Sequence, residues 1–161
     1  MNARRTGVLA VLIGLLLAAG FGTAAGSTGS CRTRASGALP SRSCTPGAVM
    51  PSLVKARICA ASFRTSRYRH VTSATRRKVY ARYGLHGAHP FPEWEVDHLV
   101  PLELGGSNRL RNLWPEHHPG DKDQVENKAH DAVCSGQISL ARAQRLMSSD
   151  WRKLRSELDT G

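Results

Sequence analysis

Apolar side chains recur at helical spacing in three segments of the chain, namely residues 73–83, the segment that begins at Asp121, and residues 139–151. Within each segment they lie three or four residues apart, which is the pattern of a helix that buries one face. The stripes consist of Val79, Tyr80 and Tyr83, then Val125, Ala129, Ala132 and Val133, then Leu140, Ala143, Met147 and Trp151. The expected N-caps are Thr72 or Ser73, then Asp121, then Ser139. We therefore expect three helices whose apolar faces lie in the core.

Between the first two of these segments the pattern is that of extended chain. Residues 94–100 ("WEVDHLV") predict a β-strand that Pro101 ends, and residues 109–114 ("RLRNLW") predict the return strand. The sequence "GGSN", residues 105–108, predicts the turn that joins them. The prolines of residues 115–120 ("PEHHPG") predict a break before the next helix. The order strand, turn, strand and helix predicts an α+β domain.

The N-terminus has the pattern of a secretory signal peptide. Arg4 and Arg5 give it a positive start, residues 8–17 are almost purely apolar, and small residues follow. The apolar run is shorter than the about 20 residues that a membrane span needs, so an uncleaved anchor is the less favoured alternative. We expect cleavage after Ala24 or Ala25, secretion, and no membrane attachment of the mature protein.

After this signal peptide, residues 1–25, composition divides the chain into an arm and one domain. Residues 26–50 are rich in Ser, Thr, Gly, Arg and Pro and predict a flexible arm, and residues 51–161 predict the folded domain. The 161 residues include 23 Lys and Arg but only 12 Asp and Glu, which gives a formal net charge of +11. A basic secreted protein is suited to bind nucleic acid, an anionic cell wall or a membrane surface, and charge alone does not choose among these.

The four cysteines, Cys31, Cys44, Cys59 and Cys134, favour a disulfide framework. An even number of cysteines in a small exported domain is typical of paired thiols, and four cysteines allow three pairings. We favour Cys31–Cys44 and Cys59–Cys134, because the first two cysteines share one loop-like segment. The sequence contains no C-x-x-C motif, which disfavours a structural zinc site.

The expected strands and helix carry side chains that suit phosphodiester hydrolysis. That reaction needs a base that activates water, and it needs positive charge at the phosphate and the leaving oxygen, which one divalent metal can supply. Neighbouring side chains on extended chain diverge, so Asp97 can hold a metal while His98 approaches water. Asn112 on the return strand can bond the loop backbone and hold His98 in place. On the polar side of the next helix, Asp123 or Asn127 can provide a second ligand.

These residues resemble the HNH endonuclease family, the ββα-metal nucleases. The stretch "DHLVPLELGGSNRLRNLW" followed by a helix carries the resemblance, and "YG", "NLWPE", "KD-x-x-EN" and "VCSG" make it similar to the small exported bacterial branch. The resemblance covers about residues 45–151. It implies that His98 is the general base, Asp97 a metal ligand and Asn112 the structural asparagine. It also implies that Asn127, the last member of the motif, ligates the metal.

The resemblance implies a ββα-metal core with supporting helices, tied here by disulfides. The implied cofactor is a divalent metal, Mg²⁺, and the implied substrate is DNA rather than RNA, held through its phosphates with little sequence preference. We expect a monomer. The chain lacks the C-x-x-C pairs that bind structural zinc in many relatives, and its extra residues before the helix leave open whether Asn127 or Asp123 is the direct ligand.

Further side chains near the expected turn have two interpretations each. Arg109 and Arg111 either contact phosphate or belong to a solvated edge strand. His130 is either a ligand or phosphate contact one turn beyond the site, or a surface residue, and His117 and His118 are favoured as surface residues. An alternative function is a basic module that binds nucleic acid or cell wall without cutting it.

Overall fold

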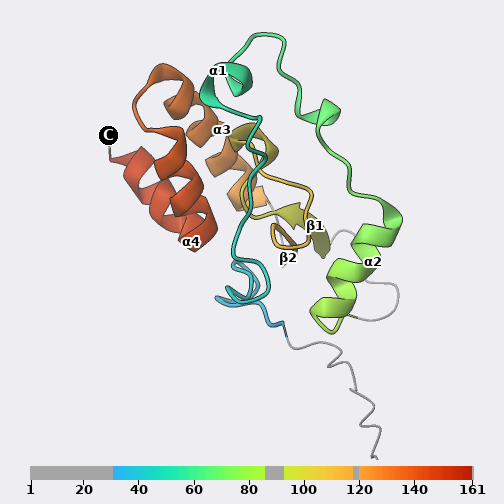
Figure 1. Cartoon of the computed structure of the whole chain (residues 1–161). Coiled ribbons are helices and arrows are strands. Elements are labelled where there is room, and N and C mark those ends of the chain that lie inside the picture. The colour runs from blue at the N-terminus through green and yellow to red at the C-terminus, as the bar shows by residue number, and fades with distance from the viewer. Residues whose placement is uncertain (1–30, 86–92, 118–119, 161) are drawn as a thin grey trace, which may run out of the picture.

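The computed structural model describes residues 31–85, 93–117 and 120–160. Its elements in chain order are α1 (Lys55–Ile58), the 3₁₀ turn η1 (Thr65–Arg67), α2 (Ser73–Arg82), β1 (Trp94–His98), the 3₁₀ turn η2 (Leu102–Leu104), β2 (Leu113–His117), α3 (Gly120–Ser135) and α4 (Leu140–Asp159). The strands β1 and β2 form an antiparallel hairpin. In Figure 1, α3 and α4 lie on one side of this hairpin and α2 lies on the other. The described chain is therefore an α+β fold, as predicted.

The three predicted helices are confirmed as α2, α3 and α4. The hydroxyl of Thr72 accepts from the backbone N–H of Thr75 at the start of α2, and Ser139 caps α4 in the same way. The start of α3 differs from the prediction by one residue. Asp121 is not the N-cap but lies in the first turn, because the helix already begins at Gly120. Its negative charge suits the positive end of the helix from that position.

The apolar stripes of α3 and α4 meet in the largest core cluster. Its buried members on these helices are Val125, Ala129, Ala132, Val133, Ala143, Met147, Trp151 and Leu154. Leu39, from the segment predicted as a flexible arm, is buried in the same cluster, and the indole N–H of Trp151 donates to the carbonyl of Ala38 at 2.8 Å. A separate small cluster joins α2 to the hairpin through Val79, Val96 and Leu113. The hairpin is thus covered from two directions.

The return strand begins and ends later in the sequence than the pattern predicts. The return strand was expected over residues 109–114, but β2 begins at Leu113 and continues through Pro115 to His117. Pro115 stands opposite Val96 in the register. Proline has no N–H to donate, but each strand of a two-stranded sheet is an edge strand and leaves one side of its backbone unpaired. The proline therefore ends neither the strand nor the pairing, and β2 ends at His117, within the segment predicted to separate the strand from α3, rather than at Trp114.

The Gly-Gly turn brings two backbone segments into contact. A Cβ atom added at Gly106 would lie 1.7 Å from the carbonyl oxygen of Val100, so no larger residue fits there. Asn112 then fastens this loop: its Nδ2 donates to the carbonyls of Val100 and Ser107, each at 2.9 Å, and its Oδ1 accepts from the N–H of Val100 at 2.9 Å and of Ala48 at 3.3 Å. Asn112 lies just before β2 rather than within it, and its side chain bonds the loop as predicted.

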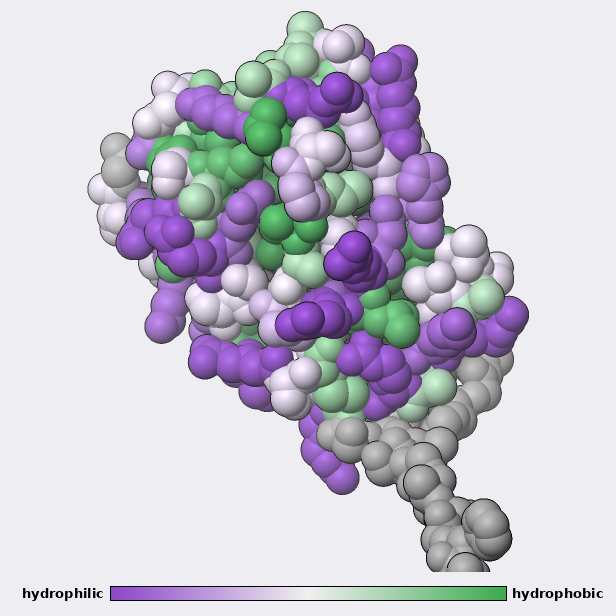
Figure 2. Space-filling view, in the orientation of Figure 1, coloured by the Kyte–Doolittle hydropathy of each residue, from purple (hydrophilic) through white to green (hydrophobic). Residues whose placement is uncertain are grey.

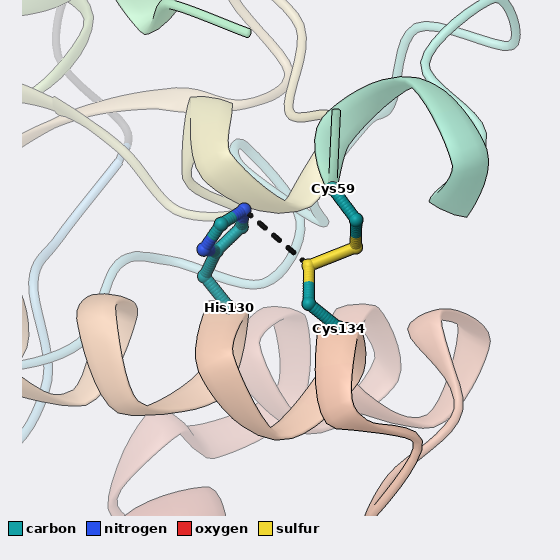
Figure 3. Close-up of side chains that lie close together, drawn as sticks. All are labelled: Cys59, His130 and Cys134. Atoms are coloured by element: carbon teal, nitrogen blue, oxygen red, sulfur yellow. Dashed lines mark hydrogen bonds between the residues drawn. A yellow bond between two sulfur atoms is a disulfide. The ribbon is translucent and has the colours of Figure 1, made fainter. Parts of the chain in front are cut away.

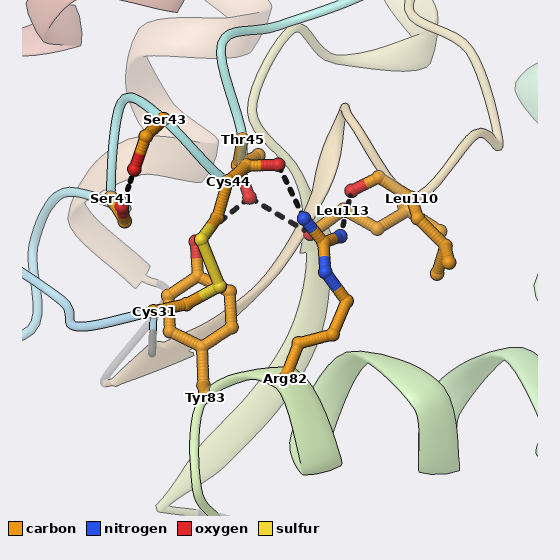
Figure 4. The surroundings of a disulfide bond; sticks show 9 residues. All are labelled: Cys31, Ser41, Ser43, Cys44, Thr45, Arg82, Tyr83, Leu110 and Leu113. Carbon is orange, nitrogen blue, oxygen red and sulfur yellow. Dashed lines mark hydrogen bonds between the residues drawn. A yellow bond between two sulfur atoms is a disulfide. The ribbon is translucent and has the colours of Figure 1, made fainter. Parts of the chain in front are cut away.

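The four cysteines form the two predicted disulfides, Cys31–Cys44 and Cys59–Cys134, and none is free. Figure 4 shows how the first is tied to its surroundings: the guanidinium of Arg82 donates to the carbonyls of Cys44 at 2.6 Å and Leu110 at 2.7 Å. Thr45 also bonds the carbonyl of Leu113 at 3.3 Å. Two disulfides indicate that the protein folds in an oxidising environment.

The expected signal peptide, residues 1–25, lies outside the described residues, as does His118. Within the described residues, no helix combines the length and the apolar character that crossing a membrane would require.

Candidate active site

His98 ends β1, and only 1% of the residue is exposed. Its Nε2 lies 3.0 Å from Oδ1 of Asn108. Two other bonds fix the orientation of that amide: Nδ2 donates to the carbonyl of Tyr68 at 2.8 Å, and Oδ1 accepts from the backbone N–H of His70 at 3.0 Å. Since an acceptor faces the ring, Nε2 carries the imidazole proton and Nδ1 carries the lone pair. Nδ1 is buried and has no hydrogen-bond partner within the described residues.

The imidazole of His98 is also electrostatically suited to accept a proton. Burial lowers its pKa below the ordinary value, while the hydrogen bond to Asn108 and the charge of Asp97 only partly oppose this effect. The ring is therefore neutral at neutral pH, which is the state that a general base requires. A buried polar atom without a partner is uncommon in native structures, and a catalytic role is one physical explanation for it.

Asp97 points into a buried cluster of charges. Lys122, in the first turn of α3, is 0% exposed and donates to Oδ2 of Asp97 at 2.5 Å and to the carbonyl of His98 at 2.9 Å. It also donates to Oε1 of Glu126, one turn further along the helix. These three acceptors use all three N–H groups of the ammonium. Burial would lower the pKa of Lys122, but the charges of Asp97 and Glu126 raise it above the ordinary value, so the group stays charged.

The carboxyl groups of this cluster share one ammonium, so they are not all ionised. Burial would raise the pKa of Asp97, but Lys122 lowers it below the ordinary value, which makes Asp97 the ionised partner. Burial and the charge of Asp97 raise the pKa of Glu116 to about 10. Glu116 is therefore protonated at neutral pH and hydrogen-bonds to Asp97 as a neutral acid. Asp97 thus has an ammonium and a carboxylic acid as partners.

The two alternative ligands on α3, Asp123 and Asn127, are both exposed. Partial desolvation of its carboxyl group nevertheless raises the pKa of Asp123, and the charge of Asp97 raises it further. Glu95 lies two positions before Asp97 and so shares its face of β1. Its pKa is raised by burial, by Asp97 and by Asp123. These three carboxyl groups therefore lie within electrostatic reach of one another.

A divalent metal would meet different surroundings at Asp97 and on α3. The ammonium of Lys122 already occupies Oδ2 of Asp97. A metal about 4 Å from that ammonium would meet a repulsion of roughly 4 kcal/mol per unit of metal charge at an effective dielectric constant of about 20. Asp123 and Asn127 lie one helical turn apart and offer exposed oxygen atoms, which are the ligands that Mg²⁺ prefers.

Arg69 brings a positive charge to the site, although the sequence pattern did not single it out. Asn108 bonds the backbone of the residues on either side of Arg69, so this part of the chain is held beside His98. The charge of Arg69 contributes to the lowered pKa of His98. The two predicted phosphate contacts, Arg109 and Arg111, lie in the turn before β2 with exposed side chains rather than on the return strand.

His130 lies against a disulfide. Its Nε2 is 3.6 Å from Sγ of Cys134 and 3.1 Å from the carbonyl of Ile58. Cys59, His130 and Cys134 are the one group of three within the described residues whose possible ligand atoms all lie within 4.8 Å of one another. Figure 3 shows that the two sulfurs are bonded to each other. Zinc binds thiolates, so the oxidised group is not a metal site.

A groove of about 530 Å³ runs along α1 and η1. Its basic and aromatic lining consists of Arg57, Arg64, Arg67, Phe63 and Tyr68, and no acidic residue is among the described residues that line it. The two aromatic rings stack with their centroids 5.3 Å apart. The carbonyl of Tyr68 accepts from Asn108, which also bonds His98, so the wall of the groove is connected to the candidate base through Asn108.

Several of these site residues were not found from the sequence. Lys122 and Glu126 are spaced one helical turn apart on a predicted helix, but this spacing ordinarily marks an exposed ion pair. Asn108 was visible as a turn residue in "GGSN", and its partners come from a segment about 40 positions earlier. Only the tertiary fold reveals that Asn108 and Lys122 support His98.

Comparisons with known proteins add no constraint on this site. No family model, no curated protein and no solved structure matches the chain. What the site can do follows from its own contacts, burial and charges.

Proposed function

We propose that this chain is a secreted endonuclease of the HNH type, which hydrolyses phosphodiester bonds in DNA with little sequence preference. One observation carries the proposal: His98 is buried and neutral, and Asn108 fixes its ring so that Nδ1 keeps an unpaired lone pair. A histidine that served only the fold would gain stability by pairing both nitrogens, because an unpaired buried group is costly. The succession β1, β2 and α3 supports a ββα-metal core as the scaffold.

In the proposed reaction, Nδ1 of His98 accepts a proton from a water molecule whose oxygen attacks the phosphorus. The bond from phosphorus to the leaving sugar oxygen breaks, and that oxygen takes up a proton from solvent. Asn108 stabilises the imidazolium, since it already accepts from Nε2. Arg69 offsets negative charge on the phosphate. When bound, Mg²⁺ supplies further positive charge to the phosphate and the leaving oxygen, and we expect Asp123 and Asn127 to hold it.

The substrate would be held mainly through its phosphates. The formal net charge of +11 and the groove along α1 and η1 favour a polyanion, and stacked aromatic rings beside arginines suit the bases of an unpaired strand. Figure 2 shows hydrophilic side chains spread over the viewed face with apolar side chains between them. Binding that rests on such contacts weakens steeply as salt is added. We propose that the monomer binds DNA in this way.

The groove also favours a second candidate function, a module that binds nucleic acid without cutting it. Binding needs the basic and aromatic lining of the groove but does not need an unpaired nitrogen on His98. The two functions therefore differ in what they require of His98: cutting requires its unpaired nitrogen, and binding does not.

The deciding experiment uses plasmid DNA with the purified protein in Mg²⁺, in Mn²⁺ or in EDTA, at low and at moderate salt. We expect nicking in the metals and none in EDTA. His98→Ala should lower the rate by about 10²- to 10⁴-fold, the usual contribution of a general base, while DNA affinity by fluorescence anisotropy is kept. His70→Ala is the matched control, because His70 is exposed and contacts the site only through its backbone N–H.

The outcomes separate the candidates. If His98→Ala nicks DNA as fast as the parent protein, the proposed mechanism is wrong. If the parent protein binds DNA and never cuts it in any of the metals, the binding module is the correct function.

A further inference from the structure

The cluster beneath His98 already contains a cation. We propose that Lys122 is the resident cation of Asp97: its ammonium takes the place at which the family resemblance puts a divalent metal, and Asp97 is a partner of this ammonium rather than a metal ligand. The contacts of Lys122 carry this inference. It rests on the proposed function only in that His98, whose backbone Lys122 holds, is the general base there.

The surroundings of the ammonium are those of a cation site. Its three acceptors are a carboxylate oxygen of Asp97, the main-chain carbonyl of His98 and a carboxyl oxygen of Glu126. Carboxylate and carbonyl oxygens are also the set that hard metal ions bind. Because Lys122 is 0% exposed and its N–H groups are all used, the site is filled by a charge that is covalently part of the chain.

The position of the three acceptors explains what the charge does. Two of them belong to consecutive residues at the end of β1, and the third belongs to α3. Lys122 therefore joins the strand that carries the candidate base to the helix that follows. It holds the carbonyl of His98 directly, so the backbone of the base is fixed without any metal.

The first test measures thermal unfolding of the full chain, with both disulfides intact, in EDTA and in Mg²⁺. Asp97→Asn should lower Tm by roughly 10 °C in both conditions, because it leaves the buried ammonium without its ionised partner. The double variant Asp97→Asn, Lys122→Met should lose less than the sum of the two single losses, since it removes both charges.

The matched control for this test is Lys128→Met. Lys128 lies on the same helix and pairs with Asp159 at 2.8 Å, but both side chains are about half exposed. An exposed pair contributes little, so Tm should change by no more than about 2 °C. The proposal is overturned if Asp97→Asn lowers Tm only when Mg²⁺ is present, because the partner of Asp97 would then be the metal.

The second test empties the site. Lys122→Ala removes the ammonium and leaves its three oxygen acceptors in place, so Ca²⁺ or Mg²⁺ at millimolar concentration should raise the Tm of this variant by several degrees relative to EDTA. If these ions raise the Tm of the parent protein, they should raise the Tm of the Asp97→Asn variant by the same amount. A folded Lys122→Ala variant that is indifferent to both ions would contradict the proposal.

The first test can decide the role of Lys122 even if the second fails, and neither test depends on nuclease activity. If Lys122→Ala does not fold, the comparison of the parent protein with Asp97→Asn still decides whether a metal or the ammonium is the partner. Neither test uses nucleic acid. A parent protein that fails to cut DNA would therefore refute the proposed function and leave the role of Lys122 to be decided by Tm alone.

Discussion

The bond between Asn108 and His98 makes the sharpest functional prediction. Asn108→Ala removes the acceptor that faces Nε2, which lies 3.0 Å away, and leaves a buried N–H without a partner. The ring then loses the contact that fixes its tautomer, and the proton can move to Nδ1, the atom that accepts a proton from water in the mechanism we propose. We expect the rate of DNA cleavage to fall while DNA affinity is kept.

The size of the effect follows from burial. An unpaired polar group in the interior costs about 1–3 kcal/mol. If this cost falls on the reactive form of the base, the rate falls by about 5- to 150-fold, since about 1.4 kcal/mol corresponds to a factor of ten. Asn108→Asp keeps an oxygen that accepts from Nε2, although it loses the donation to the carbonyl of Tyr68. It should therefore retain more activity than the alanine variant.

Two measurements check this reasoning. Initial rates on plasmid DNA give the loss of activity, and ¹⁵N NMR of the imidazole distinguishes the two tautomers of His98. Asn112→Ala is the control, because Asn112 is fully buried and bonds only backbone groups, so its loss should lower Tm more than it changes the tautomer. The reasoning fails if the parent protein carries its imidazole proton on Nδ1, or if Asn108→Ala cuts DNA at the parental rate.

Two further predictions concern stability. Replacing Cys59 and Cys134 by alanine frees a loop of 75 positions and should lower the free energy of unfolding by about 4.5 kcal/mol. Replacing Cys31 and Cys44, which are 13 positions apart, should lower it by about 3 kcal/mol. Urea unfolding measures both losses, and equal losses would contradict the loop-entropy argument. The pKa of Glu116 is raised from 4.5 to about 10 in the folded protein. Between these two pH values Glu116 loses its proton in the unfolded chain but keeps it in the folded chain. Stability should therefore fall as pH rises from about 5 to about 9, by at most about 1.4 kcal/mol per pH unit. Glu116→Gln should flatten this slope in Tm measured against pH, and an unchanged slope would show that another group causes it.

The helices were predictable because their information is local. The stripe from Val125 to Val133 follows the helical period, and the cap at Ser139 depends on a residue three positions away. The two disulfides were predictable for a similar reason, since one pair shares a single short segment and leaves the other two cysteines to each other. Such features do not depend on how distant parts of the chain meet.

The return strand was misplaced because pairing is not local. Its register is set by contacts such as His98 with Leu113 and Val96 with Pro115, and a proline suggests a break only when both sides of the strand must be paired. The burial of Lys122 was hidden for the same reason. On a helix considered by itself, a lysine four residues before a glutamate is an ordinary surface pair, and it becomes an internal one only because the end of β1 lies over it.

The supports around His98 leave one of its ring nitrogens without a hydrogen-bond partner among the described residues. Lys122 holds its carbonyl, Asn108 holds Nε2, and the N–H of the next residue, Leu99, donates to the carbonyl of Asn112 at 2.8 Å. These three supports come from α3, from the Gly-Gly turn and from the chain just before β2, so the ring and the backbone of His98 are held from different parts of the fold. A side chain held in this way loses little further freedom when it reacts, which is the condition under which a base acts efficiently. Within the described residues Nδ1 is the ring nitrogen left without a partner, and it is the atom that accepts the proton in the mechanism we propose.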